Sequence, residues 1–282
     1  MIFEFALARD SRDREHKADR TAAAVAGPKA LVQSLIKIAA YSSYRRNVEE
    51  RLFTQDRHHD SDLGIARFVA DGLHPYASSP EFTEDIESAG VPHPYDSHPS
   101  LKDRMRNVAH HLEPAAFAAV VTAVPERTWV DDIPTAAAIE QRLWSSYESR
   151  FAQDHEHSLA YRFEPRTDAE RDIVLRYFPP VSFDLAKGRA VGVSHGGLAF
   201  TDGAEQSIPW DDVKGIAFND GYFRSSLVVT HPDRVGLTAR KTKMNLRGLG
   251  KPALSAAISQ YWERHQVMRS HQRQAASEQT AV

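Results

Sequence analysis

The 282-residue sequence contains no cysteine, which excludes disulfide bonds, thiolate zinc sites, iron–sulfur clusters and thiol nucleophiles. It also lacks an apolar run near the roughly 20 residues that a membrane-spanning helix needs, since the most notable one covers only Ala115 to Val124. An excess of one charge is absent too, because 35 Lys and Arg oppose 38 Asp and Glu. An overall basic surface for nucleic acid is therefore excluded, and any anion-binding surface must be local.

The rest of the composition is that of an ordinary globular protein, with 41% apolar and 26% charged residues. At roughly 100 to 200 residues per domain, the length favours two domains. The segment Met1 to Leu7 is apolar but contains Glu4, and it lacks the basic start and cleavage site of a signal peptide. It is typical of the end of a hydrophobic helix, which makes Met1 a candidate for a misassigned or alternative start.

The first half of the chain is predicted to be mainly helical. Asp10 or Ser11 can cap a helix that runs to about residue 26, Gly27 ends it, and Pro28 opens a second helix to about residue 41. Residues 54–100 are rich in Pro, Gly, Ser, Asp and His, which predicts a long loop with one short helix near 65–71. Further helices are expected at 100–112, 114–124 and 135–151.

After about residue 178 the pattern changes to short runs of β-forming residues separated by turns such as Asp202-Gly203. An antiparallel meander of about seven strands is expected, followed by a helix at about 251–265. The predicted fold class is therefore α+β. The expected division is a helical domain at 1–153, a linker or helix at 154–180, a β domain at 181–268 and a frayed tail at 269–282. The expected strands are 181–186, 190–193, 197–201, 206–210, 213–218, 226–230 and 235–239.

Glu15 and Asp19 form the most informative pair in the helical half. They lie four residues apart, so on a helix they share one face, which small residues such as Ala22 and Ala23 line. A solvated helix whose carboxylates pair with nearby Arg and Lys explains such a pair by itself.

The wider sequence around this pair resembles a known family. The pattern Ser-Arg-x-x-Glu-x-x-Ala-Asp at 11–19 is similar to the second metal-ligand helix of the HtpX-like and CAAX-prenyl-protease family of membrane-associated zinc metallopeptidases, which are gluzincin-type peptidases. The segment Ser-His-Pro-Ser-Leu-Lys-Asp-Arg at 97–104 resembles a second motif of the same family. The resemblance covers about residues 5–112, which corresponds to the later part of such a catalytic domain.

The resemblance implies roles for four residues. Glu15 occupies the position of the third zinc ligand, and Asp19 that of a carboxylate that orients a ligand histidine. His98 becomes a candidate to approach the metal from a loop, and Arg104 a cation that supports the site. The alternative for His98 and Arg104 is a helix-capping loop with a surface arginine.

The family's zinc helix, H-E-x-x-H, is missing from the sequence. That motif holds zinc with two histidines one turn apart and places a glutamate between them as the base. None of the 14 histidines here is followed by another four residues later, and His155-Glu156-His157 has the wrong spacing. A lone Glu ligand gives neither zinc affinity nor an activated water, so we expect this chain alone to bind no zinc and hydrolyse no peptide.

Two interpretations of the helical half follow. In the first, the chain is the C-terminal portion of a zinc metalloendopeptidase that acts on a peptide or protein substrate through a part missing here. The resemblance then implies zinc in the parent protein, at the cytoplasmic face of a membrane, whereas the chain as written is expected to be soluble and cytoplasmic. In the second, the chain is a non-catalytic pseudopeptidase or adaptor. The substrate and the oligomeric state stay open.

The β-rich half resembles bacterial pleckstrin-homology-like domains, in which about seven strands form a bent sheet or barrel that one C-terminal helix closes. The resemblance rests on the strand series, on the Trp210-Asp211-Asp212 turn and on the terminal helix with Tyr261 and Trp262. Trp210 is expected in the core. In the adaptor interpretation, this domain binds a protein partner or an anionic membrane surface.

A local excess of positive charge lies near the end of the β-rich half. Between residues 234 and 251 there are six basic residues and no acidic one. A solvated strand-to-helix loop explains it, and attraction to an anionic membrane surface is the alternative. Nucleic acid is disfavoured because no aromatic residue is interleaved. The six residues are Arg234, Arg240, Lys241, Lys243, Arg247 and Lys251.

Overall fold

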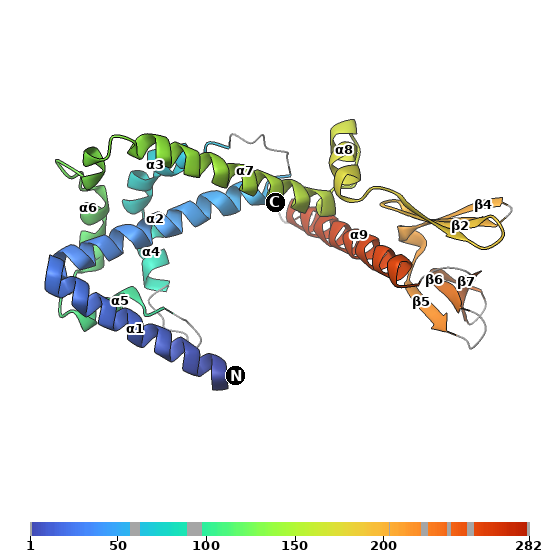
Figure 1. Ribbon diagram of the computed structural model, residues 1–282, viewed down its shortest axis with the longest axis horizontal. Coiled ribbons are helices and arrows are strands. Elements are labelled where there is room, and N and C mark those ends of the chain that lie inside the picture. Colours follow the sequence, from blue (N-terminus) through green and yellow to red (C-terminus); the bar gives the residue numbers. More distant parts are fainter. Residues whose placement is uncertain are drawn as a thin grey trace. The chain divides into compact units, whose positions relative to one another are not determined.

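The computed structural model describes residues 2–56, 63–88, 98–202, 204–220, 225–235, 238–246 and 251–280 (Figure 1). The chain divides into two compact units, Met1–Ala152 and Gln153–Val282. The first is helical and the second contains two antiparallel sheets and helices, so the predicted α+β class is confirmed. In the described part of the chain, no helix is long and apolar enough to cross a membrane.

The first unit begins with two long helices, α1 (Ile2–Ala26) and α2 (Pro28–Thr54), which meet at a sharp bend (Figure 1). Gly27 makes the bend with φ 89°, a conformation that glycine adopts at little cost, and Pro28 starts α2 where its missing N–H is not needed. The elements that follow are shorter, except for the last one, the long helix α7, which continues into the second unit. They are α3 (Ile65–Ala77), α4 (Pro80–Ser88), α5 (Leu101–Asn107), η1 (Pro114–Ala116), α6 (Phe117–Thr122), η2 (Trp129–Asp132) and α7 (Ala136–Arg162).

Both halves of α2 supply the core of the helical unit. Val32, Ile36 and Ala40, at helical spacing, are fully buried in a cluster with side chains of α3 to α6. Farther along α2, Val48 and Leu52 pack with residues of α3 and α7. Because this apolar stripe resumes after Tyr41, α2 continues to Thr54 and is longer than predicted.

Within residues 54–100, the short helix expected near 65–71 is present as the first part of α3, but the prediction of a loop around it is wrong. Helices α3 and α4 occupy much of this segment, although its composition is that of a loop. The start of α3 is stabilised from a distance, because the buried carboxylate of Glu148 on α7 accepts hydrogen bonds from the backbone N–H groups of Gly64 (3.3 Å) and Ala66 (3.2 Å). Pro75 lies near the end of α3, where it disrupts few backbone bonds.

The second unit begins with the end of α7, and its described residues form α8 (Asp168–Tyr177), seven strands and α9 (Lys251–Thr280). The strands form two antiparallel sheets, ordered β1-β2-β3-β4 and β5-β6-β7, with each strand paired to its sequence neighbour. A short 3-10 turn, η3 (Trp210–Asp212), connects the two sheets. The strands are β1 (Val181–Leu185), β2 (Arg189–Ser194), β3 (Gly197–Asp202), β4 (Ala204–Pro209), β5 (Gly215–Asp220), β6 (Ser225–Val235) and β7 (Thr238–Asn245).

Inward-facing residues of both sheets and one face of α9 form a single core. Leu254, Ile258 and Tyr261 of α9 are buried together with residues of β2, β3 and β6. Trp210 is 1% exposed, and its Nε1–H donates to the carbonyl of Ser194 at 2.8 Å, so the expected core position of this tryptophan is confirmed.

Two details of the predicted second half differ from the structure. Helix α9 continues to Thr280 where a frayed tail was expected from residue 269, and Met268 near the middle of the helix is still buried. The basic segment was interpreted as a loop, but β7 extends through it to Asn245, because Thr242 and Met244 pair with Val229 and Leu227 of β6.

Candidate functional site

Glu15 and Asp19 lie on one face of α1, as their spacing predicts. The Asp19 side chain is 2% exposed and that of Glu15 is 24% exposed. A buried carboxylate is costly unless it is paired and hydrogen-bonded. The buried carboxylate of Asp19 therefore needs a basic partner.

That partner is Arg104, which lies on α5. Its Nε donates to Asp19 Oδ2 at 2.9 Å and its Nη2 to Asp19 Oδ1 at 2.6 Å, so the guanidinium and the carboxylate form a bidentate pair. The hydrogen bond with Asp19 raises the pKa of Arg104 above its ordinary value. Nη1 of the same guanidinium lies 3.5 Å from Glu15 Oε2. Arg104 thus connects both carboxylates of α1.

His98 contacts the other oxygen of Glu15. Its Nδ1 and Glu15 Oε1 form a short contact, and the side chain of His98 is 78% exposed. Ser100, two residues later, caps α5 by accepting the backbone N–H of Asp103 at 3.1 Å. This cap starts the helix that carries Arg104. One short segment therefore positions both partners of the carboxylate pair.

The structure thus brings together the four residues that the two sequence motifs singled out, which we call the Glu15 cluster: Glu15, Asp19, His98 and Arg104. Neighbouring contacts hold α1 and α5 together. Asn107 Nδ2 donates to the carbonyl of His16 at 2.8 Å, and Arg20 Nη1 donates to Asn107 Oδ1 at 2.7 Å.

The cluster does not make a zinc site by itself. Zinc in proteins takes three or four N, O or S ligands, whereas Glu15 and His98 are the only members free to face a metal, because Asp19 is held by Arg104. Across the described ranges, no group of three or more His, Asp or Glu could hold a metal ion. His155 and His157 are neighbours on α7, where the first is buried and the second is exposed.

The six basic residues of the β domain are only partly described, since the side chains of Arg234, Arg247 and Lys251 lie outside the described residues. Arg240 donates from Nε to Asp233 Oδ2 at 2.7 Å, and this hydrogen bond lowers the pKa of Asp233. Lys241 and Lys243 are exposed two residues apart on β7. They thus share one face of the sheet.

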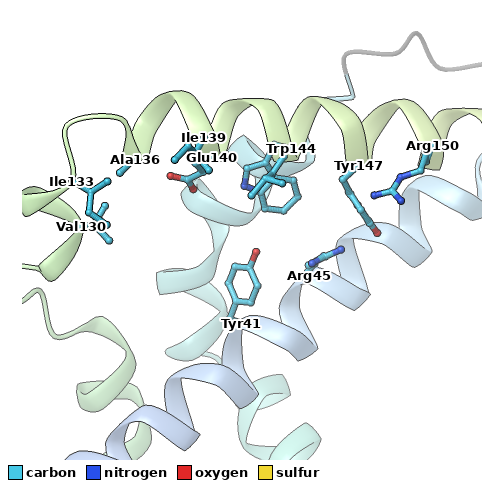
Figure 2. Close-up of a pocket in the computed structure, with 11 residues that line it drawn as sticks. Tyr41, Arg45, Val130, Ile133, Ala136, Ile139, Glu140, Trp144, Tyr147 and Arg150 are labelled. Carbon is cyan, nitrogen blue, oxygen red and sulfur yellow. The ribbon is translucent and has the colours of Figure 1, made fainter.

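The sequence analysis missed an apolar groove of about 640 Å³ in the helical unit, between α2 and α7. Figure 2 shows Tyr41 and Arg45 extending from α2 toward Trp144 and Tyr147 on α7. Arg45 lies 4.3 Å from the centre of the Tyr147 ring, and both side chains bond to Glu49 Oε1 at 2.6 Å. Burial lowers the pKa of Arg45, but its hydrogen bonds to Glu49 and Tyr147 outweigh burial and raise it overall.

Apolar side chains form the rest of this groove. Val130, Ile133, Ile139 and Leu143 line it and are 38% to 61% exposed. The helical spacing of Ile139 and Leu143 was visible in the sequence, but such spacing also describes a face that packs in a core. These side chains give the groove a partly exposed apolar surface.

No protein-family model matches the chain, and no curated protein matches it significantly. A function for the chain therefore has to be inferred from its own residues.

Proposed function

We propose that the chain is the C-terminal portion of a zinc metalloendopeptidase of the HtpX-like class, with a pleckstrin-homology-like domain as its β unit. Zinc-dependent hydrolysis of peptide bonds is the activity that the resemblance implies. The chain alone is inactive in this proposal, because polypeptide outside these 282 residues would have to supply the H-E-x-x-H helix.

The observation that carries the proposal is the contact between residues of two separate motifs. The motifs at 11–19 and 97–104 resembled the same family independently, and the structure joins them through Arg104 with Asp19 and through His98 with Glu15. If either motif resembled the family by chance, there would be no reason for the two motifs to contact each other in the structure. The convergence of residues 83 and 85 positions apart therefore favours a common site.

The environment of Glu15 suits its proposed role. The bidentate bond from Arg104 fixes Asp19 in place, whereas Glu15 keeps 24% of its side chain exposed and can accept a further partner. Ala22, two turns after Glu15 on α1, is half-buried. A helix that carries zinc-binding histidines could use the Glu15 carboxylate on this face as a further ligand.

The β unit supports the second half of the proposal. A four-stranded and a three-stranded antiparallel sheet, with one C-terminal helix that packs into their shared core, is the arrangement expected of a pleckstrin-homology-like domain. This is a likeness of architecture.

The alternative function is a non-catalytic adaptor that binds a protein partner or an anionic membrane surface through the β unit. The exposed pair Lys241 and Lys243 on the edge strand β7 favours the membrane surface, since each basic residue near such a surface contributes about 1 kcal/mol. In this function the Glu15 cluster only holds α1 against α5.

The experiment that separates the two functions compares the 282-residue chain with a form extended upstream by the in-frame genomic sequence. The peptidase proposal expects an H-E-x-x-H motif in the extension, one zinc per chain and hydrolysis of casein. It expects Glu15→Ala to abolish both zinc and hydrolysis, while Asp13→Ala, an exposed carboxylate on the same helix, changes neither. An upstream sequence without the motif, or zinc binding that is indifferent to Glu15→Ala, would leave the adaptor function.

A further inference from the structure

A small polar cavity of about 240 Å³ lies within the β unit. Four segments enclose it: the turn between β2 and β3, η3, the middle of α9, and the connection from α7 to α8. Pockets for drug-sized ligands span roughly 300 to 1,000 Å³, so this cavity suits a smaller ligand. The residues of its lining that matter here are Glu164, His195, Trp210, Asp211, Arg264 and His265.

Arg264 on α9 contributes a buried positive charge. The residue is 1% exposed, and its Nε donates to the carbonyl of Ala160 at 2.9 Å while its Nη2 donates to that of Phe163. Burial lowers the pKa of Arg264 to about 10, so the guanidinium remains charged near neutral pH. Two carbonyls at the end of α7 offset part of this charge, but within the described ranges no carboxylate pairs with it.

The two carboxylates that line the cavity have basic partners of their own. Asp211 accepts from Arg269 Nε at 2.7 Å, and Glu164 lies 3.8 Å from Arg166 and accepts from Gln272 Nε2 at 2.7 Å. Both carboxylates of the lining thus have basic partners, whereas among the described residues no carboxylate pairs with Arg264.

Two histidines add hydrogen-bonding capacity. The Nδ1 atom of His195 is buried and has no hydrogen-bond partner among the described residues. His265 is 6% exposed, stacks on Trp262 and lies 3.5 Å from Asp211. A buried imidazole nitrogen without a partner costs free energy unless water or a ligand satisfies it.

We propose that this cavity binds a phosphate-sized oxyanion, held by the guanidinium of Arg264 and the imidazole of His195. A guanidinium and an imidazole N–H are both suitable donors to a tetrahedral anion. The ligand is a free inorganic or small organic anion or the phosphate of a lipid headgroup. The site is independent of the Glu15 cluster, so the peptidase proposal can fail without affecting it.

The test is a titration of the full chain with sulfate, followed by tryptophan fluorescence, because Trp210 lines the cavity and Trp262 stacks on His265. Sulfate is chosen because its charge is constant between about pH 5 and pH 8. Saturable binding is expected, which chloride at equal ionic strength does not reproduce. Binding should tighten several-fold as the pH falls and the histidines become protonated.

Variants locate the site. His195→Ala is expected to weaken sulfate binding about tenfold, the value of one charge-assisted hydrogen bond. Lys214→Ala removes an exposed positive charge of the same unit that does not line the cavity, and it should leave binding unchanged. Arg264 is left intact because it also holds two backbone carbonyls and its loss can unfold the unit. In nuclear magnetic resonance, sulfate should raise the pKa of His195, an effect that a purely structural histidine would not show.

Vesicles distinguish the two sources of the anion. Binding to phosphatidic acid vesicles that His195→Ala abolishes would identify a lipid headgroup, and sulfate binding without such vesicle binding would identify a free anion. The proposal is overturned if sulfate acts no differently from chloride, or if Lys214→Ala weakens sulfate binding as much as His195→Ala does.

Discussion

Arg104 donates two hydrogen bonds, of 2.9 and 2.6 Å, to the carboxylate of Asp19, although the two residues lie 85 positions apart in the sequence. The Asp19 side chain is 2% exposed, whereas the Arg104 side chain is 25% exposed, so only the aspartate of the pair is buried. The cost of breaking it therefore depends on which partner is removed.

Arg104→Ala should destabilise the helical unit by about 2–4 kcal/mol, because it leaves the buried Asp19 carboxylate unpaired. The control is Arg106→Ala on the same helix, whose side chain is 68% exposed and pairs with Asp103. That change should cost no more than about 0.5 kcal/mol. Urea unfolding followed by far-ultraviolet circular dichroism measures both. Equal losses in the two variants would contradict a special role for the pair with Asp19.

Gly197→Ala should be far more destabilising than Gly196→Ala. A Cβ at Gly197 would lie 2.2 Å from the carbonyl oxygen of Ile208 on β4, and the residue has φ 157°. At Gly196 the nearest atom to a new Cβ is Ser194 Oγ at 3.8 Å. The first change should cost about 2–4 kcal/mol and the second less than about 1 kcal/mol.

Thermal unfolding of the two glycine variants, followed by near-ultraviolet circular dichroism, provides the comparison. A Gly197→Ala chain as stable as the wild type would show that β3 and β4 do not approach as closely as the register of Gly197 with Pro209 requires.

The sequence predicted those elements whose signals are local. The bend at Gly27 and Pro28 follows from two residues with restricted roles, and the strands follow from turn dipeptides between β-forming runs. A short helix near 65–71 was predicted, but the sequence did not show that the backbone N–H groups at the start of α3 donate to Glu148, more than 80 residues away. No local pattern contains such a contact.

The candidate sites show the same limit. The shared face of Glu15 and Asp19 follows from a spacing of four, but spacing alone could not show that Arg104 contacts both. It was the family resemblance that singled out His98 and Arg104. The cavity around His195 and Arg264 gave no sequence signal at all, because its lining comes from four separate segments.

The β unit should lose stability as the pH falls below about 6.5. Burial lowers the pKa values of His195 and His265 below the ordinary 6.5, so the unfolded chain binds protons more readily than the folded one. The β unit therefore has its full stability above about pH 6.5, and its stability falls as the pH is lowered from there to the pKa values of these histidines in the folded chain. Around His265, Asp211 and Glu164 oppose the shift, whereas Arg264 and Arg269 support it.

The measurement is the unfolding temperature between about pH 5 and pH 8 in chloride buffer without sulfate. His265→Gln should flatten this dependence, since it removes a buried group that titrates. The exposed His157→Gln serves as the control and should keep the slope. A wild-type chain that is equally stable across this range would show that protonation of these histidines costs nothing in the folded state.

The 282-residue chain should retain no stoichiometric zinc after exposure to the metal and its removal by dialysis. Glu15 offers one carboxylate, His98 one ring that is largely exposed, and Arg104 competes electrostatically with any cation near them. Two ligands beside a guanidinium are too few to hold zinc against water. Elemental analysis decides the matter. One zinc per chain that Glu15→Ala removes and Asp13→Ala preserves would mean that histidines beyond the Glu15 cluster complete a site, and it would make the chain itself a candidate enzyme.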